Sequence, residues 1–386
     1  MAKRSAAASL LLLLVAAPAP AAELKASGYL KDVWQHSRSA VDGRPFYLNL
    51  SRARLTLDAS ASVFRTHADY DHQLAYGSFF RTREFQVFGY SPPKPWLDME
   101  QTISTGTLNG WGHGAYRAWV GLEDERGVLR AGRQRIAWGT GKIWNPTDVL
   151  NPYQPTSIER DERRGVDALY GRLGVGSLGQ LELAWAGEDR WVDHALLARG
   201  RTNLHDWDVS LLGGKVSGST ASLVMGGDFA GTLLEGTLHG EWAYFRPERR
   251  TPYWKAGLGY DYTVPSETRW RWLKDAAFVV EYYHAGNGQT DRKRYDFTAV
   301  RAGKEVSVAR NYFGASASQD LHPLVKIELY SVVNVDDSST FFTPSLTWNA
   351  LNDLYLSAAA QRFGGGRSTE YGRSPNSVLM SAQYYF

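Results

Sequence analysis

The densest cluster of charges in this 386-residue sequence lies at the end of a long polar stretch, residues 139–165. The cluster consists of Glu159, Arg160, Asp161, Glu162, Arg163 and Arg164. Charges in a narrow passage determine which ions and dipolar solutes can enter it. A solvated surface loop is the alternative, but such a loop has little use for Trp138, Ile143 and Trp144. We therefore predict that this stretch folds inward and narrows a pore.

A second set of charges falls at alternate positions, as on the polar face of a strand. It consists of Arg52, Arg54, Asp69, Asp71, Arg117 and Arg130, and we predict that these residues line the pore. Arginines in a pore wall draw anions. The arginines and aspartates could instead simply pair across neighbouring strands, and this alternative stays open. Four aromatic residues share the polar face and are candidates for stacking on a solute: Trp119, Tyr283, Tyr330 and Tyr355.

Patterns typical of catalysis are missing from the sequence. Its nine histidines are scattered, and no nucleophile elbow, paired-histidine motif or serine–histidine spacing occurs. The absence of cysteine excludes disulfides, thiolate metal sites and covalently attached haem. We predict a protein that is not an enzyme and uses no cofactor and no metal, with a hydrolase site assembled from distant segments as a minor alternative.

Strands must position these side chains, because apolar and polar residues alternate along much of the chain. Between residues 254 and 264, for example, Trp254, Leu258 and Tyr262 share one face, while Lys255 and Asp261 share the other. A helix would need apolar residues three and four apart. The alternation predicts strands near residues 24–36, 46–60, 64–76, 113–123, 128–138, 166–174, 179–187, 206–214, 219–227, 233–246, 253–264, 274–286, 307–319, 324–335, 340–349, 353–363 and 377–386.

Short turns and long polar connections join these segments, as in outer-membrane barrels. The long connections are residues 77–112, 139–165, 188–205, 287–306 and 364–376. We predict one all-β domain over residues 22–386, a transmembrane antiparallel up-and-down β-barrel with an inward-folded loop. Seventeen segments conflict with the even number found in bacterial barrels, and the halves fall out of phase between about residues 186 and 247. The prediction is therefore about 16 strands, within 14 to 18, with one segment misassigned or one strand hidden in a long loop.

Two features favour a membrane barrel over a soluble β-sandwich. A sandwich needs an apolar, filled interior, whereas the many charges on the inner face suit a water-filled lumen. The C-terminal segment alternates Val378, Met380, Ala382, Tyr384 and Phe386 with other residues. It resembles the signal by which the outer-membrane assembly machinery recognises a last strand, with Tyr384 and Phe386 as the signal residues.

The first residues predict export. Lys3 and Arg4 precede an apolar run, and small residues at 19–21 offer a cleavage site, which is the pattern of a signal peptide over residues 1–21. The apolar run is too short to span a bilayer. Removing Lys3 and Arg4 from 43 basic residues leaves 41 against 40 acidic ones, so a nucleic-acid partner is not expected. We predict an outer-membrane location, with outer-membrane lipid, the assembly machinery and a small polar solute as partners.

The segments 132–139, 145–152 and 159–165 resemble part of a porin-like outer-membrane β-barrel family of Gram-negative bacteria, similar in style to alginate-export-type barrels. The resemblance covers residues 45–190 and implies a fold and a location. The predicted function is passive diffusion of small hydrophilic solutes through a charged lumen narrowed by loop 139–165. The alternative is a scaffold or sleeve for a periplasmic partner protein, such as an electron-conduit cytochrome or a polysaccharide export system. An outer-membrane hydrolase is a third possibility.

Overall fold

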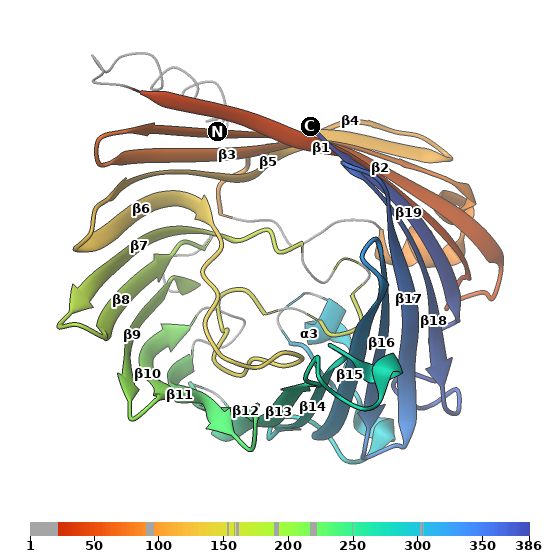
Figure 1. Cartoon of the computed structure of the whole chain (residues 1–386). Coiled ribbons are helices and arrows are strands. Elements are labelled where there is room, and N and C mark those ends of the chain that lie inside the picture. The colour runs from red at the N-terminus through yellow and green to blue at the C-terminus, as the bar shows by residue number, and fades with distance from the viewer. Residues whose placement is uncertain are drawn as a thin grey trace.

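The computed structural model describes residues 22–89, 96–152, 154–157, 159, 162–188, 193–216, 222–248, 250–301, 303 and 305–386. The predicted signal peptide, Arg160 and Asp161 lie outside the described residues. The described part of the chain forms a single sheet of 19 strands in which β1 pairs with β19, so that the sheet closes into a barrel (Figure 1).

The strands follow one another along the chain, and the neighbouring described strands pair antiparallel. They are β1 (Glu23–Arg38), β2 (Pro45–Ala61), β3 (Phe64–Tyr76), β4 (Glu100–Thr105), β5 (Asn109–Glu123), β6 (Gly127–Gln134), β7 (Val166–Val175), β8 (Gly179–Ala186), β9 (Ala195–Leu204), β10 (Trp207–Val216), β11 (Ser222–Leu233), β12 (Gly236–Pro247), β13 (Tyr253–Thr263), β14 (Ala277–Ala285), β15 (Asn311–His322), β16 (Val325–Asn334), β17 (Ser339–Leu351), β18 (Leu354–Gly364) and β19 (Ser377–Tyr385). Short helical segments lie in the connections: η2 (Ser78–Arg81), α2 (Arg83–Phe88), η4 (Arg271–Leu273), η5 (Arg292–Arg294) and α3 (Thr298–Arg301). Among the described residues, no helix has the length and apolar character needed to cross a membrane.

The predicted fold class is confirmed, but the central estimate of 16 strands is too low. Within the described residues, 18 strands close the barrel and β4 stands outside that ring. The strand of the ring that the sequence analysis missed is β9, inside the predicted loop 188–205, and β4 lies inside the predicted loop 77–112. The outward positions of β9 include Ala198 and Gly200, which are too small to give a clear alternation. With β9 in place, the two halves of the barrel come into phase.

The outward and inward faces alternate as predicted. On β13, Leu258 points outward and is 53% exposed, and its cross-strand neighbour Tyr282 on β14 is also exposed. On the opposite face of β14, Glu281 is only 4% exposed. Large apolar side chains are therefore displayed on the outside and carboxylates are enclosed inside, which is the arrangement of a barrel wall in lipid.

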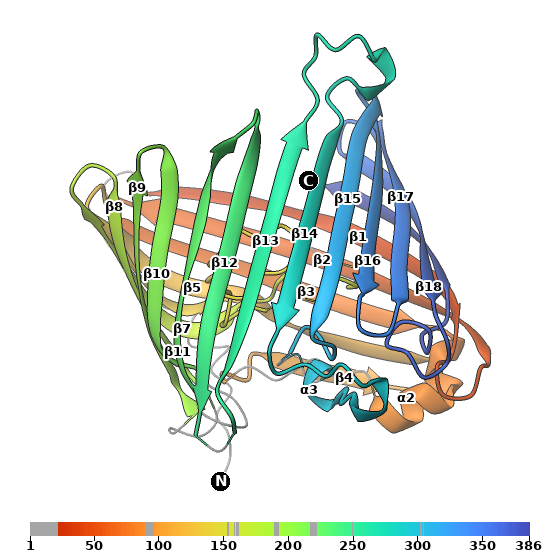
Figure 2. The same cartoon turned by 90° about the horizontal axis from the view of Figure 1, so that it is seen from below.

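The two ends of the barrel differ. At one end the connections are short, and the turn between β11 and β12 needs only Leu234 and Glu235, both at positive φ, as in a two-residue hairpin turn. The connection between β13 and β14, residues 264–276, is the long one at this end. Figure 2 shows α2, α3 and β4 gathered at the other end. Short turns at one end and long loops at the other is the predicted asymmetry.

β4 completes the barrel wall beside β5, at the point where the chain leaves the wall after β6. β6 ends at Gln134, earlier than predicted, and residues 135–165, here called the inner loop, depart from this point. β4 then pairs with the part of β5 that β6 does not reach. At the junction, the fully buried Arg133 donates from Nε to Asp167 (2.9 Å) and from Nη1 to the Ala115 carbonyl (2.9 Å). This ion pair belongs to the wall and does not face the lumen.

Candidate functional site

The inner loop crosses the interior of the barrel (Figure 1). One of its anchors is a carboxylate on β14. Glu281 accepts hydrogen bonds from three consecutive backbone amides of the loop: Lys142, Ile143 (2.9 Å) and Trp144 (3.0 Å). His239 of β12 lies 2.9 Å from the same carboxylate. Three backbone amides in a row form a concave group of donors that suits an anion. The loop backbone is thus held against the wall by a side chain of the wall.

A second carboxylate, Glu241 of β12, holds the loop residues on either side of this segment. It accepts from the amides of Thr140 (2.5 Å), Gly141 (2.6 Å) and Thr147 (3.1 Å), and from the Thr147 hydroxyl (2.7 Å). The backbone passes so close that a Cβ on Gly139 would lie 2.5 Å from Glu241 Oε1, and Gly139 has a φ of +104°. Only glycine fits here without strain.

Aromatic packing reinforces these two anchors. The ring of Trp144 stacks on Tyr283 of β14 with 5.4 Å between centroids and 7° between planes. The neighbouring strand β15 has a glycine, Gly314, beside this ring. A Cβ atom at this position would come within 2.7 Å of both Ile143 and Trp144. Tyr283 and Tyr330, candidates for stacking on a solute, are buried in this cluster. Tyr283 positions the loop, and neither ring is available to a solute.

The other arm of the inner loop docks on the opposite wall, formed by β1, β2 and β3. Arg52 donates to Glu159 from two nitrogens, at 3.1 and 2.8 Å, and Lys31 Nζ lies 2.9 Å from Glu159 Oε1. Arg54 donates to Glu162 at 2.9 Å and binds Asp71 with two bonds of 2.6 and 2.7 Å. Paired, charge-assisted bonds of this kind fix geometry as well as charge. The loop therefore bridges two walls of the lumen.

The loop carboxylates stay ionised at this anchor. Burial by itself would raise the pKa values of Glu159 and Glu162, but the guanidinium groups of Arg52 and Arg54 outweigh it and hold both pKa values below their ordinary range. Asp148 behaves differently. Burial raises its pKa to about 7 although Arg163 Nη1 lies 3.0 Å from its carboxylate. The arm of the loop that carries Glu159 and Glu162, here called the outer arm, is thus held by fully charged groups, whereas Asp148 is close to neutralisation near pH 7.

Arg117 of β5 points into the same region. It donates from Nη2 to the backbone carbonyl of Arg163, and its guanidinium lies 5.3 Å from the ring centre of Tyr116. No carboxylate of a described residue forms an ion pair with it. Its charge is therefore less compensated than those of Arg52 and Arg54, which are matched by Asp71, Glu159 and Glu162.

The structure brings together most, but not all, of the residues selected from the sequence. Arg52, Arg54, Asp71, Arg117, Glu159, Glu162 and Arg163 lie around the outer arm of the loop. Arg164 lies against Glu100 of β4. Asp69 bonds to Thr56 (2.6 Å) and to His67, and Arg130 pairs with Glu123 and lies over Trp119. These last two residues belong to another cluster of the inner wall, in which Trp119 contacts both His67 and Arg130.

Residues that the sequence analysis missed are the acceptors of the loop backbone. Glu241 and Glu281 lay in the polar face of predicted strands, but nothing in their spacing indicated that main-chain amides would reach them. Lys31, whose Nζ atom lies 2.9 Å from Glu159, and the Tyr29 hydroxyl, which donates to Glu162 at 2.9 Å, were also missed, because nothing in the sequence indicated that the loop carboxylates would reach β1. Among the described residues, no group of three or more histidine, aspartate or glutamate side chains could hold a metal ion.

Exchanging Glu281 for glutamine should loosen the loop while leaving the wall intact. Glutamine has one acceptor oxygen where glutamate has two, so it cannot accept all three backbone hydrogen bonds, which reach both oxygens of Glu281. Hydrogen bonds to charged groups contribute about 1.5–3 kcal/mol. We expect limited trypsin digestion of folded Glu281→Gln protein to cut at Lys142 or Arg163 much faster than in the parent. Glu123→Gln, which removes a carboxylate that contacts only the wall residue Arg130, is the matched control. Equal resistance of both variants would contradict the anchoring role.

Comparisons with known proteins give a fold. No family model and no curated protein sequence matches the chain. Among solved structures, OpdQ of Pseudomonas aeruginosa aligns over 94% of this chain and 99% of its own, with 11% identity and a TM-score of 0.57. The outer membrane protein OprD of the same species aligns over 94% and 93%, with 10% identity and a TM-score of 0.51. An anion-selective porin from Comamonas acidovorans aligns over 95% and 100%, with 10% identity and a TM-score of 0.50. These neighbours support a porin-like barrel and give no support to the comparison with alginate-export-type barrels.

Proposed function

We propose that this chain is a passive outer-membrane channel in which small hydrophilic solutes diffuse past the inner loop. The observation that carries the proposal is the bridge formed by that loop, which is bound by Glu241 and Glu281 on one wall and by Arg52 and Arg54 on the other. A loop fixed at both sides leaves a passage of defined width lined by charges, and such a constriction controls permeation sterically and electrostatically.

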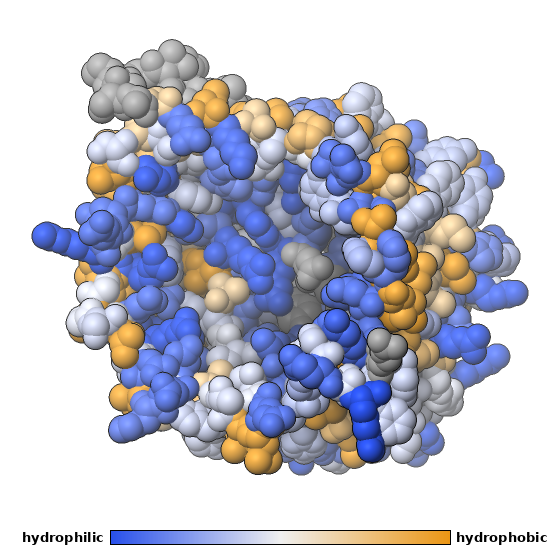
Figure 3. Space-filling view, viewed as in Figure 1, coloured by the Kyte–Doolittle hydropathy of each residue, from blue (hydrophilic) through white to orange (hydrophobic). Residues whose placement is uncertain are grey.

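The surface of the barrel supports this function and its location. Figure 3 shows that the end with the short turns is hollowed and that the residues around the hollow are mostly hydrophilic. Exposed leucine, tryptophan and tyrosine side chains cover the outward face of the strands. We propose that the apolar outside lies in the outer membrane, with the short turns in the periplasm and the long loops outside. Residues 1–21 would act as the signal peptide, and Tyr384 and Phe386 as the signal for the assembly machinery.

The inner loop also discriminates between this function and the two alternatives. A sleeve for a periplasmic partner protein needs an interior wide enough to hold that partner, whereas here the barrel's own loop is built across the interior. A hydrolase needs a nucleophile beside an activating base. The buried His239 lies between Glu281 and Asp261, and Glu281 anchors the loop. Permeation without bond chemistry is therefore the function that the geometry supports best.

The experiment that tests the proposal combines ion currents with a change of one charge. Purified protein in planar bilayers should form open channels with a measurable anion-to-cation permeability ratio. Arg117→Gln should lower that ratio, because Arg117 has no carboxylate partner among the described residues, whereas Arg117→Lys keeps the charge and should keep most of the preference. Failure of the folded protein to conduct would contradict the channel. Identical ratios in parent and Arg117→Gln would contradict the role of this arginine alone.

A further inference from the structure

The connection between β13 and β14, residues 264–276 and here called the tryptophan loop, is folded on itself at the end of the barrel that has the short turns. At its base, the Ser266 hydroxyl donates to Asp275 Oδ1 at 2.6 Å. Further along, the amide of Leu273 donates to the carbonyl of Trp270 at 2.8 Å, beside the short helix η4. Internal hydrogen bonds of this kind give a surface loop a defined shape.

Two tryptophans of this folded loop are exposed. Trp270 is 51% exposed and Trp272 is 67% exposed. The guanidinium group of Arg269 lies 5.3 Å from the centre of the Trp270 ring, and the side chain of Lys274 is exposed as well. Tryptophan rings have a large apolar body and one polar edge, which suits the boundary between lipid chains and head groups. The composition of the loop thus matches a membrane interface.

The tryptophan loop is attached to the outward face of the barrel. Gln319 of β15 points outward, and its side-chain amide donates to the backbone carbonyls of Trp272 (2.5 Å) and Lys274 (3.4 Å). Figure 2 shows the loop rising from the end of β13 and bending toward the end of β15. The attachment is therefore on the side of the wall that faces away from the lumen.

The attachment point lies within the apolar band of the wall. Two residues before Gln319 lies Ala317, which pairs with the exposed Phe278 of β14. Across from Gln319 on β16 lies Ile327, and two residues after Gln319 lies the exposed Leu321. The carbonyls of the loop thus meet the wall at a level where the neighbouring side chains are apolar. In the proposed orientation this is the level of the lipid.

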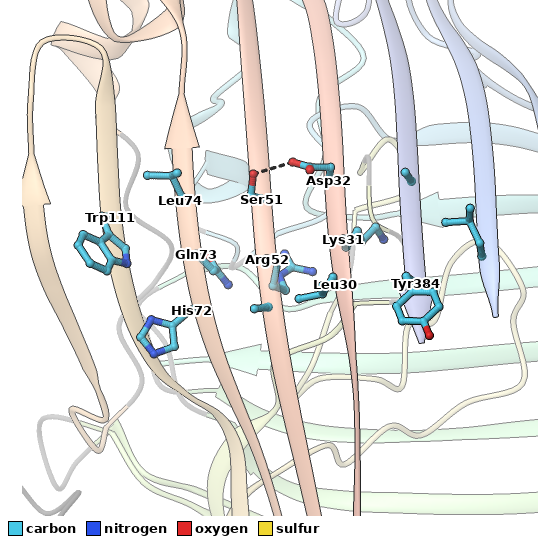
Figure 4. A pocket seen from close by; sticks show the side chains of 13 residues that line it. Leu30, Lys31, Asp32, Ser51, Arg52, His72, Gln73, Leu74, Trp111 and Tyr384 are labelled. Carbon is cyan, nitrogen blue, oxygen red and sulfur yellow. Dashed lines mark hydrogen bonds between the residues drawn. The ribbon is translucent and has the colours of Figure 1, made fainter. Parts of the chain in front are cut away.

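A polar side chain on the outward face needs a partner from the protein, because lipid chains offer none. The carboxylate of Asp32 on β1 accepts from the Ser51 hydroxyl at 2.6 Å (Figure 4) and from the Asn49 side-chain amide at 3.0 Å. Both partners belong to the neighbouring strand, β2. The side-chain amide of Gln319 instead has its acceptors in the tryptophan loop. The same contact thus satisfies Gln319 and holds the loop beside the wall.

We propose that the tryptophan loop anchors the barrel to the phospholipid leaflet beside it, with Trp270 and Trp272 in the head-group region and Arg269 and Lys274 beside anionic head groups. The outward attachment favours a lipid surface over a soluble partner protein, because a loop fixed at the level of the apolar band lies next to lipid. Interfacial tryptophan and basic anchors set the depth and tilt of a membrane protein. The inference rests on the proposed function in one respect, which is that this face of the barrel lies in the membrane.

The depth of the loop is measurable with a single label, because the sequence has no cysteine. The full-length protein is reconstituted into vesicles made of equal parts of phosphatidylcholine and phosphatidylglycerol. A nitroxide on Trp270→Cys should be several-fold less accessible to a water-soluble nickel complex than a nitroxide on Glu125→Cys. Glu125 lies in the short turn between β5 and β6, at the same end of the barrel. Equal accessibility of the two labels would overturn the proposal, because the loop would then lie in water.

A label on Leu258→Cys separates failure of the anchor from failure of the proposed function. Leu258 is an exposed outward residue of β13, and its label should be shielded from the nickel complex and open to oxygen if this face lies in the membrane. A shielded label at Leu258 together with a water-exposed label at Trp270 would overturn the anchor alone. A water-exposed label at Leu258 would contradict the membrane location, and the anchor with it.

Gln319→Leu tests the attachment. Leucine suits lipid but cannot donate to the carbonyls of Trp272 and Lys274, so the label at Trp270 should become several-fold more accessible to the nickel complex. Ser331→Leu makes a similar polar-to-apolar exchange on the outward face of β16, away from the loop, and should leave the accessibility of the label unchanged. The same accessibility in Gln319→Leu and in the parent would overturn the role of this contact.

The charges of the loop are tested with two kinds of vesicle. The loop carries three basic residues against two acidic ones, namely Arg269, Arg271 and Lys274 against Glu267 and Asp275. The label at Trp270 should therefore lie deeper in the mixed vesicles than in vesicles of phosphatidylcholine alone. Arg269→Gln combined with Lys274→Gln should remove this difference, whereas Arg126→Gln, in the short turn after β5, should keep it. An equal depth in both kinds of vesicle without these substitutions would overturn the contact with anionic head groups.

Discussion

A chain whose inner loop is cut back, with residues 139–162 replaced by a short glycine–serine linker, should conduct about twofold more current or better, because the narrowest cross-section limits ion flow. The replaced segment contains Trp144, Glu159 and Glu162, and thus removes both attachments of the bridge. Glu241 and Glu281 would remain on the wall and face water. Single-channel recording in planar bilayers measures the effect.

The control is a deletion in another long connection between two strands, one that does not enter the lumen. Residues 264–276 connect β13 and β14, and the Trp272 carbonyl of this connection accepts from Gln319, an outward-facing residue of β15. Shortening this connection should leave conductance at the parental value. If the inner-loop deletion folds and conducts no better than the parent, the loop does not form the constriction.

Leu258→Arg should nearly abolish insertion of folded protein. Leu258 is an outward residue of β13, and an arginine facing hydrocarbon at mid-height costs about 2–4 kcal/mol. That cost lowers the population of correctly inserted barrel by between one and three powers of ten, since about 1.4 kcal/mol corresponds to a factor of ten. The amount of protein that keeps its compact, heat-sensitive mobility in electrophoresis of outer membranes reports the result.

Asp261→Asn, three residues further on the same strand, is the matched control. Asp261 faces the lumen, where its carboxylate lies 3.2 Å from His239 Nδ1, and asparagine can still bond there. We expect near-normal insertion of this variant. Equal losses from Leu258→Arg and Asp261→Asn would contradict the separation of a lipid face from a water face.

The barrel was predictable because its signal is local. Alternation along 254–264 or 274–286 depends only on neighbouring residues, and cross-strand pairs such as Leu258 with Tyr282 follow once the strands are in order. β9 was not predicted because the small residues Ala198 and Gly200 make the alternation on its outer face unclear. β4 was not predicted because it fills a gap that exists only where β6 leaves the wall. The number of strands therefore needed three-dimensional information, although the fold class did not.

The candidate site was predictable in composition but not in its pairing. Arg52 meets Glu159, 107 residues away, only because the inner loop crosses the lumen in one particular path. From the sequence, Arg54 had two candidate roles, which were pairing with an aspartate across strands and facing the loop. The structure shows both contacts, with Asp71 and with Glu162. The acceptors Glu241 and Glu281 serve backbone amides, and backbone amides carry no sequence signature.

The bridge also imposes an order of events on the newly made protein. The amide of Lys142 donates to Glu281, 139 residues further along the chain. The inner loop therefore cannot make this contact until β14 has joined the wall. A barrel that lacks β14 therefore cannot complete the bridge across its lumen. Completion of the barrel and narrowing of its lumen are coupled in time, and an incomplete barrel cannot be selective.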